Sequence, residues 1–151
     1  MSSHLIMKKI ALIAVSLVLF LSCRKQVGGP SPNCTPSMAT IAGNYKITAV
    51  SYKATPTSPE EDYLDEFLAE TCQRDNLYTF KTDGTYQLAD AGVVCSPPEN
   101  DNGTWNLEGT TNLQIDGEPT ILESFDCKIW VVANTDLLVT GDKLKLTLTR
   151  Q

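Results

Sequence analysis

Hydrophobic and polar residues alternate from Gly43 onward in short segments, and turn residues separate each segment from the next. The clearest segment is 144–150, in which Leu occupies every second position up to Leu148 and polar residues fill the positions between. Successive side chains of a strand point to opposite faces, so such a segment buries one face and exposes the other. The pattern predicts a series of antiparallel strands that form a barrel or a sandwich.

Glycine-containing turns join several of these segments into hairpins. Asp-Gly at 83–84 lies between two alternating segments, which is the strongest short hairpin signal. The strands on its two sides place Tyr78, Phe80, Tyr86 and Leu88 on one face. The predicted hairpins pair residues 76–81 with 85–89, 103–107 with 112–116, and 136–140 with 144–150.

Two further segments complete the predicted sheet. The first strand covers Asn44–Lys53 and turns Tyr45, Ile47 and Ala49 inward. The segment 120–132 is one bent strand or two shorter ones, and the total is eight strands if it is one.

Residues 59–70 do not alternate. Ser58 precedes them as a suitable N-cap, and acidic residues occupy the first turn, where the helix dipole favours negative charge. Tyr63 and Phe67 share one stripe of this segment. We therefore predict a short helix that covers one end of a barrel.

The N-terminal residues predict export. Lys8 and Lys9 precede an apolar run over 10–21, which is too short to span a bilayer as a helix and fits a cleaved signal. Cys23 follows this run as in the bacterial lipobox, where the cysteine becomes the new N-terminus and carries acyl chains such as palmitate. An ordinary signal with a coincidental cysteine, or an uncleaved anchor, is the alternative.

These features divide the chain into a signal peptide (1–22), a flexible tether (23–40) and one domain (41–151). Lipidation would place the protein in the cell envelope, on a membrane. The residues after Cys23 are basic or neutral instead of acidic, which favours the periplasmic side of the outer membrane over display on the cell surface.

The charge balance and the missing histidines exclude several functions. The chain has 12 Lys and Arg against 18 Asp and Glu, so phosphate backbones repel it and we expect no nucleic-acid partner. Its one histidine, His4, belongs to the predicted signal peptide. Ser-His-Asp catalysis, Cys-His catalysis and imidazole metal sites are therefore excluded from the domain. We expect no enzyme, no catalytic residue, no metal and no cofactor.

Four cysteines remain beyond Cys23, and an even number in an exported chain favours two disulfides. Three pairings are possible. The hairpin between Cys72 and Cys95 would bring these two residues together, which leaves Cys34 for Cys127.

A set of motifs spreads over residues 40–151: Gly43-Asn-Tyr, Cys72-Gln-Arg-Asp-Asn, Asp83-Gly-Thr-Tyr, Cys95 and Gly103-Thr-Trp, followed by the Leu-rich end. In this order they resemble the lipocalin-like lipoprotein domains common in Bacteroidetes. The resemblance implies an eight-stranded antiparallel up-and-down β-barrel, or a flattened half-barrel, on a lipid tether. It also implies a small ligand, although eight strands can equally enclose a filled core.

The candidate site consists of inward-facing aromatic residues and one carboxylate. Glu123 falls between Ile121 and Phe125 in the same register, which predicts a buried and therefore paired or pKa-shifted carboxyl group. The aromatic residues are pocket candidates or, in the alternative interpretation, ordinary core. The ligand-pocket candidates are Tyr45, Tyr78, Phe80, Tyr86, Trp105, Glu123 and Phe125.

Two functions are compatible with these sequence features. The first is a membrane-tethered envelope lipoprotein that binds or carries a small apolar molecule in its barrel. The alternative is a solid barrel that acts as a structural or protein-interaction subunit or inhibitor. In that case Tyr52, Trp130 and Leu138, which fall on faces predicted to point outward, could form an apolar patch for an envelope protein.

Overall fold

The computed structural model describes residues 34–151 as a closed antiparallel β-barrel of eight strands with few helices. A two-residue strand, β2, pairs with the edge of β1, and pairing of β1 with β9 closes the barrel. The sheet order is β2-β1-β3-β4-β5-β6-β7-β8-β9. The elements are α2 (Met38–Ile41), β1 (Gly43–Lys53), β2 (Glu61–Asp62), α3 (Leu64–Phe67), the 3₁₀ helix η1 (Thr71–Asp75), β3 (Leu77–Phe80), β4 (Thr85–Ala89), β5 (Asp101–Glu108), β6 (Asn112–Ile115), β7 (Glu118–Phe125), β8 (Ile129–Thr135) and β9 (Lys143–Arg150).

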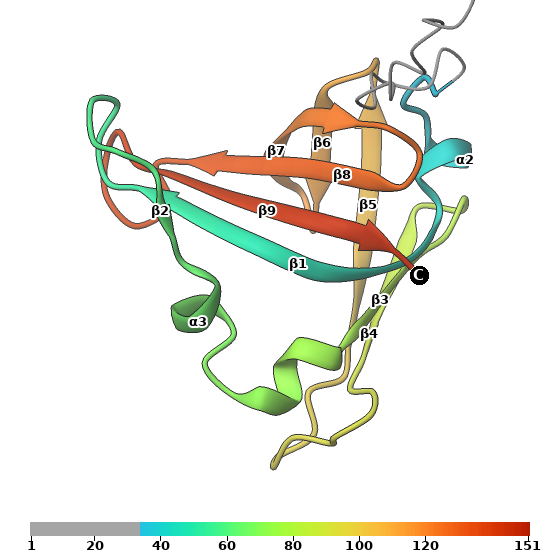
Figure 1. The fold of residues 1–151 in the computed structure, drawn as a ribbon. Helices are drawn as coiled ribbons and strands as arrows, with labels where there is room; N and C mark the ends of the chain where they lie inside the picture. The colour runs from blue at the N-terminus through green and yellow to red at the C-terminus, as the bar shows by residue number, and fades with distance from the viewer. Residues whose placement is uncertain (1–33) are drawn as a thin grey trace, which may run out of the picture.

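The barrel is flattened, with strands that cross at a steep angle. In Figure 1, β7, β8, β9 and β1 run across the picture, and β3, β4 and β5 run down it. Helix α2 and the C-terminus lie at one end of β1, whereas β2 and the β8–β9 turn lie at the other. The segment with α3 and η1 passes below β1. The predicted eight-stranded antiparallel barrel is confirmed.

A bulge shifts the first strand relative to its predicted faces. The register with β9 slips between Ile47 and Ala49, so Tyr45, Ile47 and Val50 are buried while Ala49 is exposed. The prediction that Ala49 points inward is wrong, because the extra residue of a bulge turns every later side chain to the opposite face.

The region after Glu118 contains two strands instead of one. The carboxylate of Asp126 accepts hydrogen bonds from the N–H groups of Lys128 (2.9 Å) and Ile129 (2.6 Å), and these bonds form a tight turn between β7 and β8. The hairpin predicted for 136–140 with 144–150 is wrong. Strand β9 pairs instead with β8, so the count of eight strands holds although its members differ.

Residues 136–142 form the loop between β8 and β9. The buried carboxylate of Asp142 accepts hydrogen bonds from the N–H groups of Leu137, Leu138 and Val139, at 2.8 to 3.0 Å, and from the Tyr52 hydroxyl at 3.1 Å. A backbone whose donors point at one carboxylate cannot also pair with a neighbouring strand.

The predicted helix over 59–70 is wrong except for the single turn of α3. Glu61 and Asp62 pair with Tyr52 and Ser51 as β2, and Glu60 binds Lys145 on the outer face of the sheet. Glu61 and Asp62, which were predicted to form the first helical turn, are therefore paired with the edge of β1 instead.

Both predicted disulfides are confirmed, Cys34–Cys127 and Cys72–Cys95. The first bridge and helix α2 make residues 34–40 part of the folded domain, whereas the sequence predicted a tether to residue 40. The signal peptide 1–22, the lipidation site Cys23 and the rest of the tether lie outside the described residues. Within residues 34–151, no helix has the length and apolar character needed to cross a membrane.

Candidate functional site

A cavity of about 240 Å³ lies inside the barrel. Its wall is mainly apolar and aromatic, and helix α3 contributes Phe67 to it. The lining residues are Ile47, Phe67, Tyr78, Phe80, Tyr86, Ile115, Glu118, Thr120, Trp130, Val132, Asn134, Leu144, Leu146 and Leu148. The barrel is therefore not solid, and it has the mostly apolar interior that small-molecule sites share.

Packed aromatic rings close the barrel at the end near α2. Phe80 is their centre, with ring centroids of Trp130 at 4.9 Å, Trp105 at 5.5 Å and Tyr45 at 6.1 Å, all edge to face. Such geometry stabilises aromatic pairs beyond the area that they bury. The Nε1–H of Trp105 donates to the Lys81 carbonyl oxygen (2.9 Å), which fixes this ring to the β3–β4 turn.

Tyr45 and Arg150 complete the closed end. The Tyr45 hydroxyl donates to the Ile41 carbonyl oxygen (2.6 Å) and accepts from Arg150 Nη2 (2.7 Å). The guanidinium carbon lies 5.2 Å from the centre of the Tyr45 ring, and Nη2 also donates to the Thr40 carbonyl oxygen (2.6 Å). Burial raises the pKa of Tyr45, although the charge of Arg150 acts in the opposite direction.

The predicted pocket residues occupy three different places. Tyr78, Phe80 and Tyr86 line the cavity. Tyr45 and Trp105 belong to the buried core at the closed end, and so does Phe125 on β7; none of these three is part of the cavity wall. The seventh candidate, Glu123, lies outside the barrel.

The prediction that Glu123 points inward is wrong. The β7–β8 register shifts between Leu122 and Ser124, so Leu122 and Phe125 are both buried and Glu123 lies on the outer face. There its carboxylate forms ion pairs with Lys143 and, at 4.0 Å, with Lys145. Alternation placed this residue inside because a bulge is invisible to a strict period of two.

Several cavity residues were not predicted from the sequence, among them Glu118, Trp130 and Asn134. Trp130, which was predicted to point outward, is fully buried and lines the cavity, as does Asn134 on the same strand. Trp130, Val132 and Asn134 alternate along β8. If the sequence is divided into one strand that ends near Asp126 and a second that begins at Ile129, alternation along the second strand places Trp130, Val132 and Asn134 on one inward face. The Asn134 amide is then a polar group among apolar neighbours.

Trp130 and Asn134 each carry a buried polar atom without a partner. Trp130 Nε1, a donor, and Asn134 Oδ1, an acceptor, make no hydrogen bond within residues 34–151. Leaving such a group unpaired costs about 1–3 kcal/mol, so native structures contain few of them. Because both residues line one cavity, their polar side chains are suited to a ligand that carries a polar group.

The rim of the cavity holds a tyrosine–aspartate pair. The Tyr86 hydroxyl donates to Asp116 Oδ2 (2.6 Å), and Asp116 Oδ1 accepts from the Thr104 N–H (2.8 Å). Burial and then the hydrogen bond to Asp116 raise the pKa of Tyr86, and the hydrogen bond from Tyr86 lowers the pKa of Asp116. Gly103 leaves room for both side chains, because a Cβ there would overlap the Tyr86 ring and the Asp116 carboxylate.

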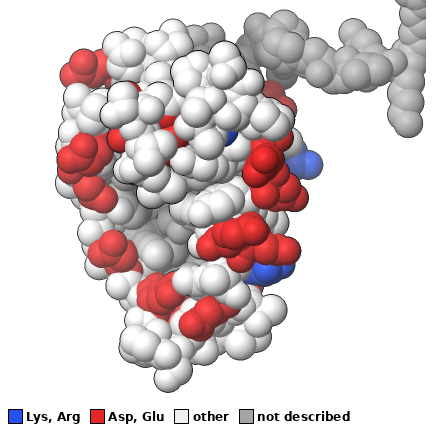
Figure 2. Space-filling model, turned by 90° about the vertical axis from the view of Figure 1, so that its left-hand side faces the viewer, with Lys and Arg blue, Asp and Glu red and all other residues white. Residues whose placement is uncertain are grey.

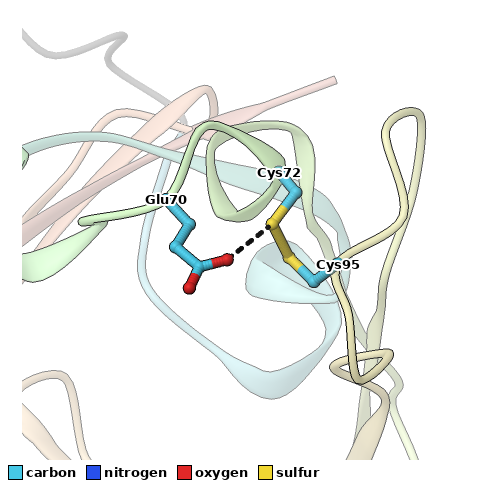
Figure 3. A group of neighbouring side chains, drawn as sticks. All are labelled: Glu70, Cys72 and Cys95. Carbon is cyan, nitrogen blue, oxygen red and sulfur yellow. Dashed lines mark hydrogen bonds between the residues drawn. A yellow bond between two sulfur atoms is a disulfide. The ribbon is translucent and has the colours of Figure 1, made fainter.

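A group of possible metal ligands lies beside η1, away from the cavity wall. Figure 3 shows Glu70 next to the Cys72–Cys95 disulfide, with Oε2 of Glu70 3.6 Å from Cys72 Sγ. Cysteine binds a metal as the thiolate, and both of these sulfurs are bonded to each other in the disulfide. The group therefore serves as a covalent clamp between η1 and the β4–β5 loop while the bridge is intact.

Comparisons with known proteins give a match to a family model and a similarity to solved structures. A family model described as a lipocalin-like domain matches residues 41–146. Among solved structures, a major allergen of cockroaches, Per a 4, is similar, with 15% sequence identity and a TM-score of 0.49. The similarity covers 82% of this chain and 74% of the allergen chain. No curated protein matches the sequence.

Proposed function

Because the chain belongs to the family of lipocalin-like domains, we propose that it binds a small, largely apolar molecule inside its barrel. One observation carries this proposal. Two residues of the apolar cavity wall, Trp130 and Asn134, carry a buried donor (Nε1) and a buried acceptor (Oδ1) that have no partner within residues 34–151. A bound molecule with one polar group would satisfy these atoms and gain the apolar contact of the remaining wall.

The size of the cavity limits the ligand. Its 240 Å³ corresponds to about eight water molecules in the liquid, at roughly 30 Å³ each. This is below the range of about 300–1,000 Å³ that is typical of drug-sized ligands. The proposed ligand is therefore a compact molecule of one or two rings, or a short chain.

We further propose that the domain works at the cell envelope on a lipid anchor at Cys23. The signal-like run 10–21 and the cysteine that follows it support this location. The mass of the mature N-terminus tests the anchor directly. The expected result is a diacyl or triacyl cysteine, and Cys23→Ala should give a protein that is uncleaved or released. An unmodified Cys23 in the membrane fraction would refute lipidation.

Binding in the cavity is tested with a neutral probe, 2-(2-naphthyl)ethanol, and equilibrium dialysis of the purified protein. Leu146→Trp fills the cavity from β9 and should weaken binding at least about tenfold, a difference of about 1.4 kcal/mol. Leu138→Trp, on the exposed β8–β9 loop, is the matched control and should bind as the wild type does. Equal binding by both variants, or no binding by the wild type, would refute a cavity ligand.

A protein-interaction role has one observation in its favour. Leu137, Leu138 and Val139 are 50%, 61% and 54% exposed, and the Asp142 carboxylate holds their backbone in place. Three consecutive exposed apolar side chains on a fixed loop are suited to contact another protein. Photo-crosslinking from position 138 in envelopes tests this role. A single defined adduct that Leu137→Asp abolishes would support it, and the absence of any adduct would refute it.

A further inference from the structure

The charge of the cavity wall separates one class of ligand from the others. We infer that the cavity selects a small organic cation, an amine on an apolar or aromatic body, over a carboxylate of the same shape. The inference rests on the proposed function, because it requires that a ligand enters the cavity at all.

The first argument is the charge of the lining itself. Glu118, the first residue of β7, carries the one ionisable acid on the wall, and no Lys or Arg of the described residues belongs to the wall. Glu118 is solvent-exposed, so it lies at the mouth of the cavity. A carboxylate ligand would be repelled by the Glu118 carboxylate, and it would lose its hydration without gaining an opposite charge. An ammonium ligand would be attracted by the same carboxylate.

The second argument is the aromatic content of the wall. Phe67, Tyr78, Phe80, Tyr86 and Trp130 all line the cavity. The negative face of an aromatic ring attracts a cation, and the attraction grows when the cation is desolvated. Aromatic side chains from α3, β3, β4 and β8 therefore offer an ammonium a favourable surface in an otherwise apolar space.

The third argument is the unpaired acceptor. Asn134 is a residue of the wall, and its buried Oδ1 has no donor inside residues 34–151. An ammonium supplies up to three N–H donors and no acceptor, which suits this oxygen. A carboxylate supplies acceptors alone, and in that case Asn134 Oδ1 would stay unpaired. The remaining atom, Trp130 Nε1–H, fits a hydroxyl or ether oxygen on the same ligand.

Nearby charges strengthen the preference. Asp116 binds Tyr86 at the rim, and Glu99 is close enough to Tyr78 to raise the pKa of its hydroxyl, after the larger effect of burial. Three basic side chains of β9 have other partners. Lys143 and Lys145 pair with acids on the outer face, and Arg150 donates to backbone carbonyls at the closed end.

The face that carries β2 and the β8–β9 turn is acidic. Figure 2 views the molecule from the side of β2 and the β8–β9 turn, and it shows many acidic and few basic side chains on that face. The full chain has a formal net charge of −6. A surface potential of this sign raises the local concentration of cations and lowers that of anions.

The test compares three ligands that share one naphthyl body: 2-(2-naphthyl)ethylamine, 2-(2-naphthyl)ethanol and 2-naphthylacetate. Their dissociation constants are measured by isothermal titration calorimetry at pH 7 and low salt. The amine should bind about tenfold more tightly than the alcohol, and the carboxylate at least about tenfold more weakly. Added salt should reduce both differences, because the charged groups at the mouth are solvent-exposed.

Two variants locate the effect. Glu118→Gln removes the charge at the mouth and should reduce the amine-to-alcohol affinity ratio to about threefold or less. Glu108→Gln removes an equal charge from the exposed end of β5, outside the cavity wall, and should leave the ratio unchanged. A ratio that responds equally to both variants would overturn the role of Glu118.

The outcomes separate this inference from the proposed function. If none of the three ligands binds the wild type, the proposed function fails. If the alcohol binds in a manner that Leu146→Trp weakens, but the carboxylate binds as tightly as the amine, the proposed function stands and the cation preference is overturned.

Discussion

Replacing Tyr45 by Phe removes one oxygen atom from the closed end of the barrel and leaves the ring in place. This oxygen donates to the Ile41 carbonyl and accepts from Arg150, and the side chain is fully buried, so water cannot replace either bond. A neutral hydrogen bond contributes about 1 kcal/mol and one to a charged group about 1.5–3 kcal/mol. In Tyr45→Phe, Arg150 retains its hydrogen bond to the Thr40 carbonyl oxygen, so its guanidinium still has a hydrogen-bond partner. We therefore expect Tyr45→Phe to lower the free energy of unfolding by about 2–3 kcal/mol.

Urea unfolding followed by tryptophan fluorescence measures this loss. With an m value of about 1–2 kcal/mol/M, the midpoint should fall by roughly 1–3 M. Tyr78→Phe is the matched control, because the Tyr78 hydroxyl makes no hydrogen bond within residues 34–151, and its cost should stay within about 0.5 kcal/mol. Equal costs for the two substitutions would mean that the hydroxyl network with Arg150 does not stabilise the closed end.

Three further predictions concern stability. The Cys34–Cys127 disulfide spans a sequence separation of 93 residues, and the Cys72–Cys95 disulfide spans 23. In the chain-entropy model, replacing both cysteines of a bridge by serine should lower the free energy of unfolding by about 4.7 kcal/mol for the first bridge and about 3.4 kcal/mol for the second. A larger loss for the second bridge in urea unfolding would contradict this prediction. Gly103→Ala should cost about 1–3 kcal/mol, seen as a lower Tm, because its Cβ overlaps the Tyr86 ring; an unchanged Tm would show that this ring moves freely. Burial raises the pKa of Asp142, but three backbone N–H groups outweigh this and hold the pKa below its usual value. A carboxyl group with a lowered pKa stabilises the fold above its unfolded pKa, near 4, and this contribution disappears as the pH falls through the folded pKa. The stability gap between wild type and Asp142→Asn should therefore be larger at pH 7 than at pH 3, and a gap independent of pH would contradict this.

Local signals in the sequence predicted the parts of the fold that local physics determines. The Asp-Gly at 83–84 indicated the β3–β4 hairpin, with Phe80 opposite Tyr86 as alternation requires. The glycine at 109 indicated the β5–β6 hairpin, with Trp105 opposite Ile115. In both cases a short turn fixes the register, so the period of two remains valid along the whole hairpin.

The errors arise at bulges and at loops where a carboxylate binds nearby backbone N–H groups. Bulges near Ile47 and Glu123 change the register in mid-strand, and the carboxylates of Asp126 and Asp142 organise loops by accepting backbone N–H groups. The alternation of hydrophobic and polar residues reports neither the bulges nor these loop hydrogen bonds. Part of the candidate site was missed for the same reason, because Trp130 and Asn134 lie on a strand whose start is set by the Asp126 turn.

The Cys34–Cys127 bridge also determines how the domain carries mechanical load. Force applied to the chain ahead of residue 34 passes directly through the disulfide to Cys127, at the turn between β7 and β8. In a pull against the C-terminus, residues 35–126 lie outside the load path, so they cannot be drawn out while the bridge is intact. The segment that bears the tension consists of β8 and β9, which are hydrogen-bonded to each other along their full length. The cavity wall contributed by β3, β4 and β6 is thereby protected from stretching.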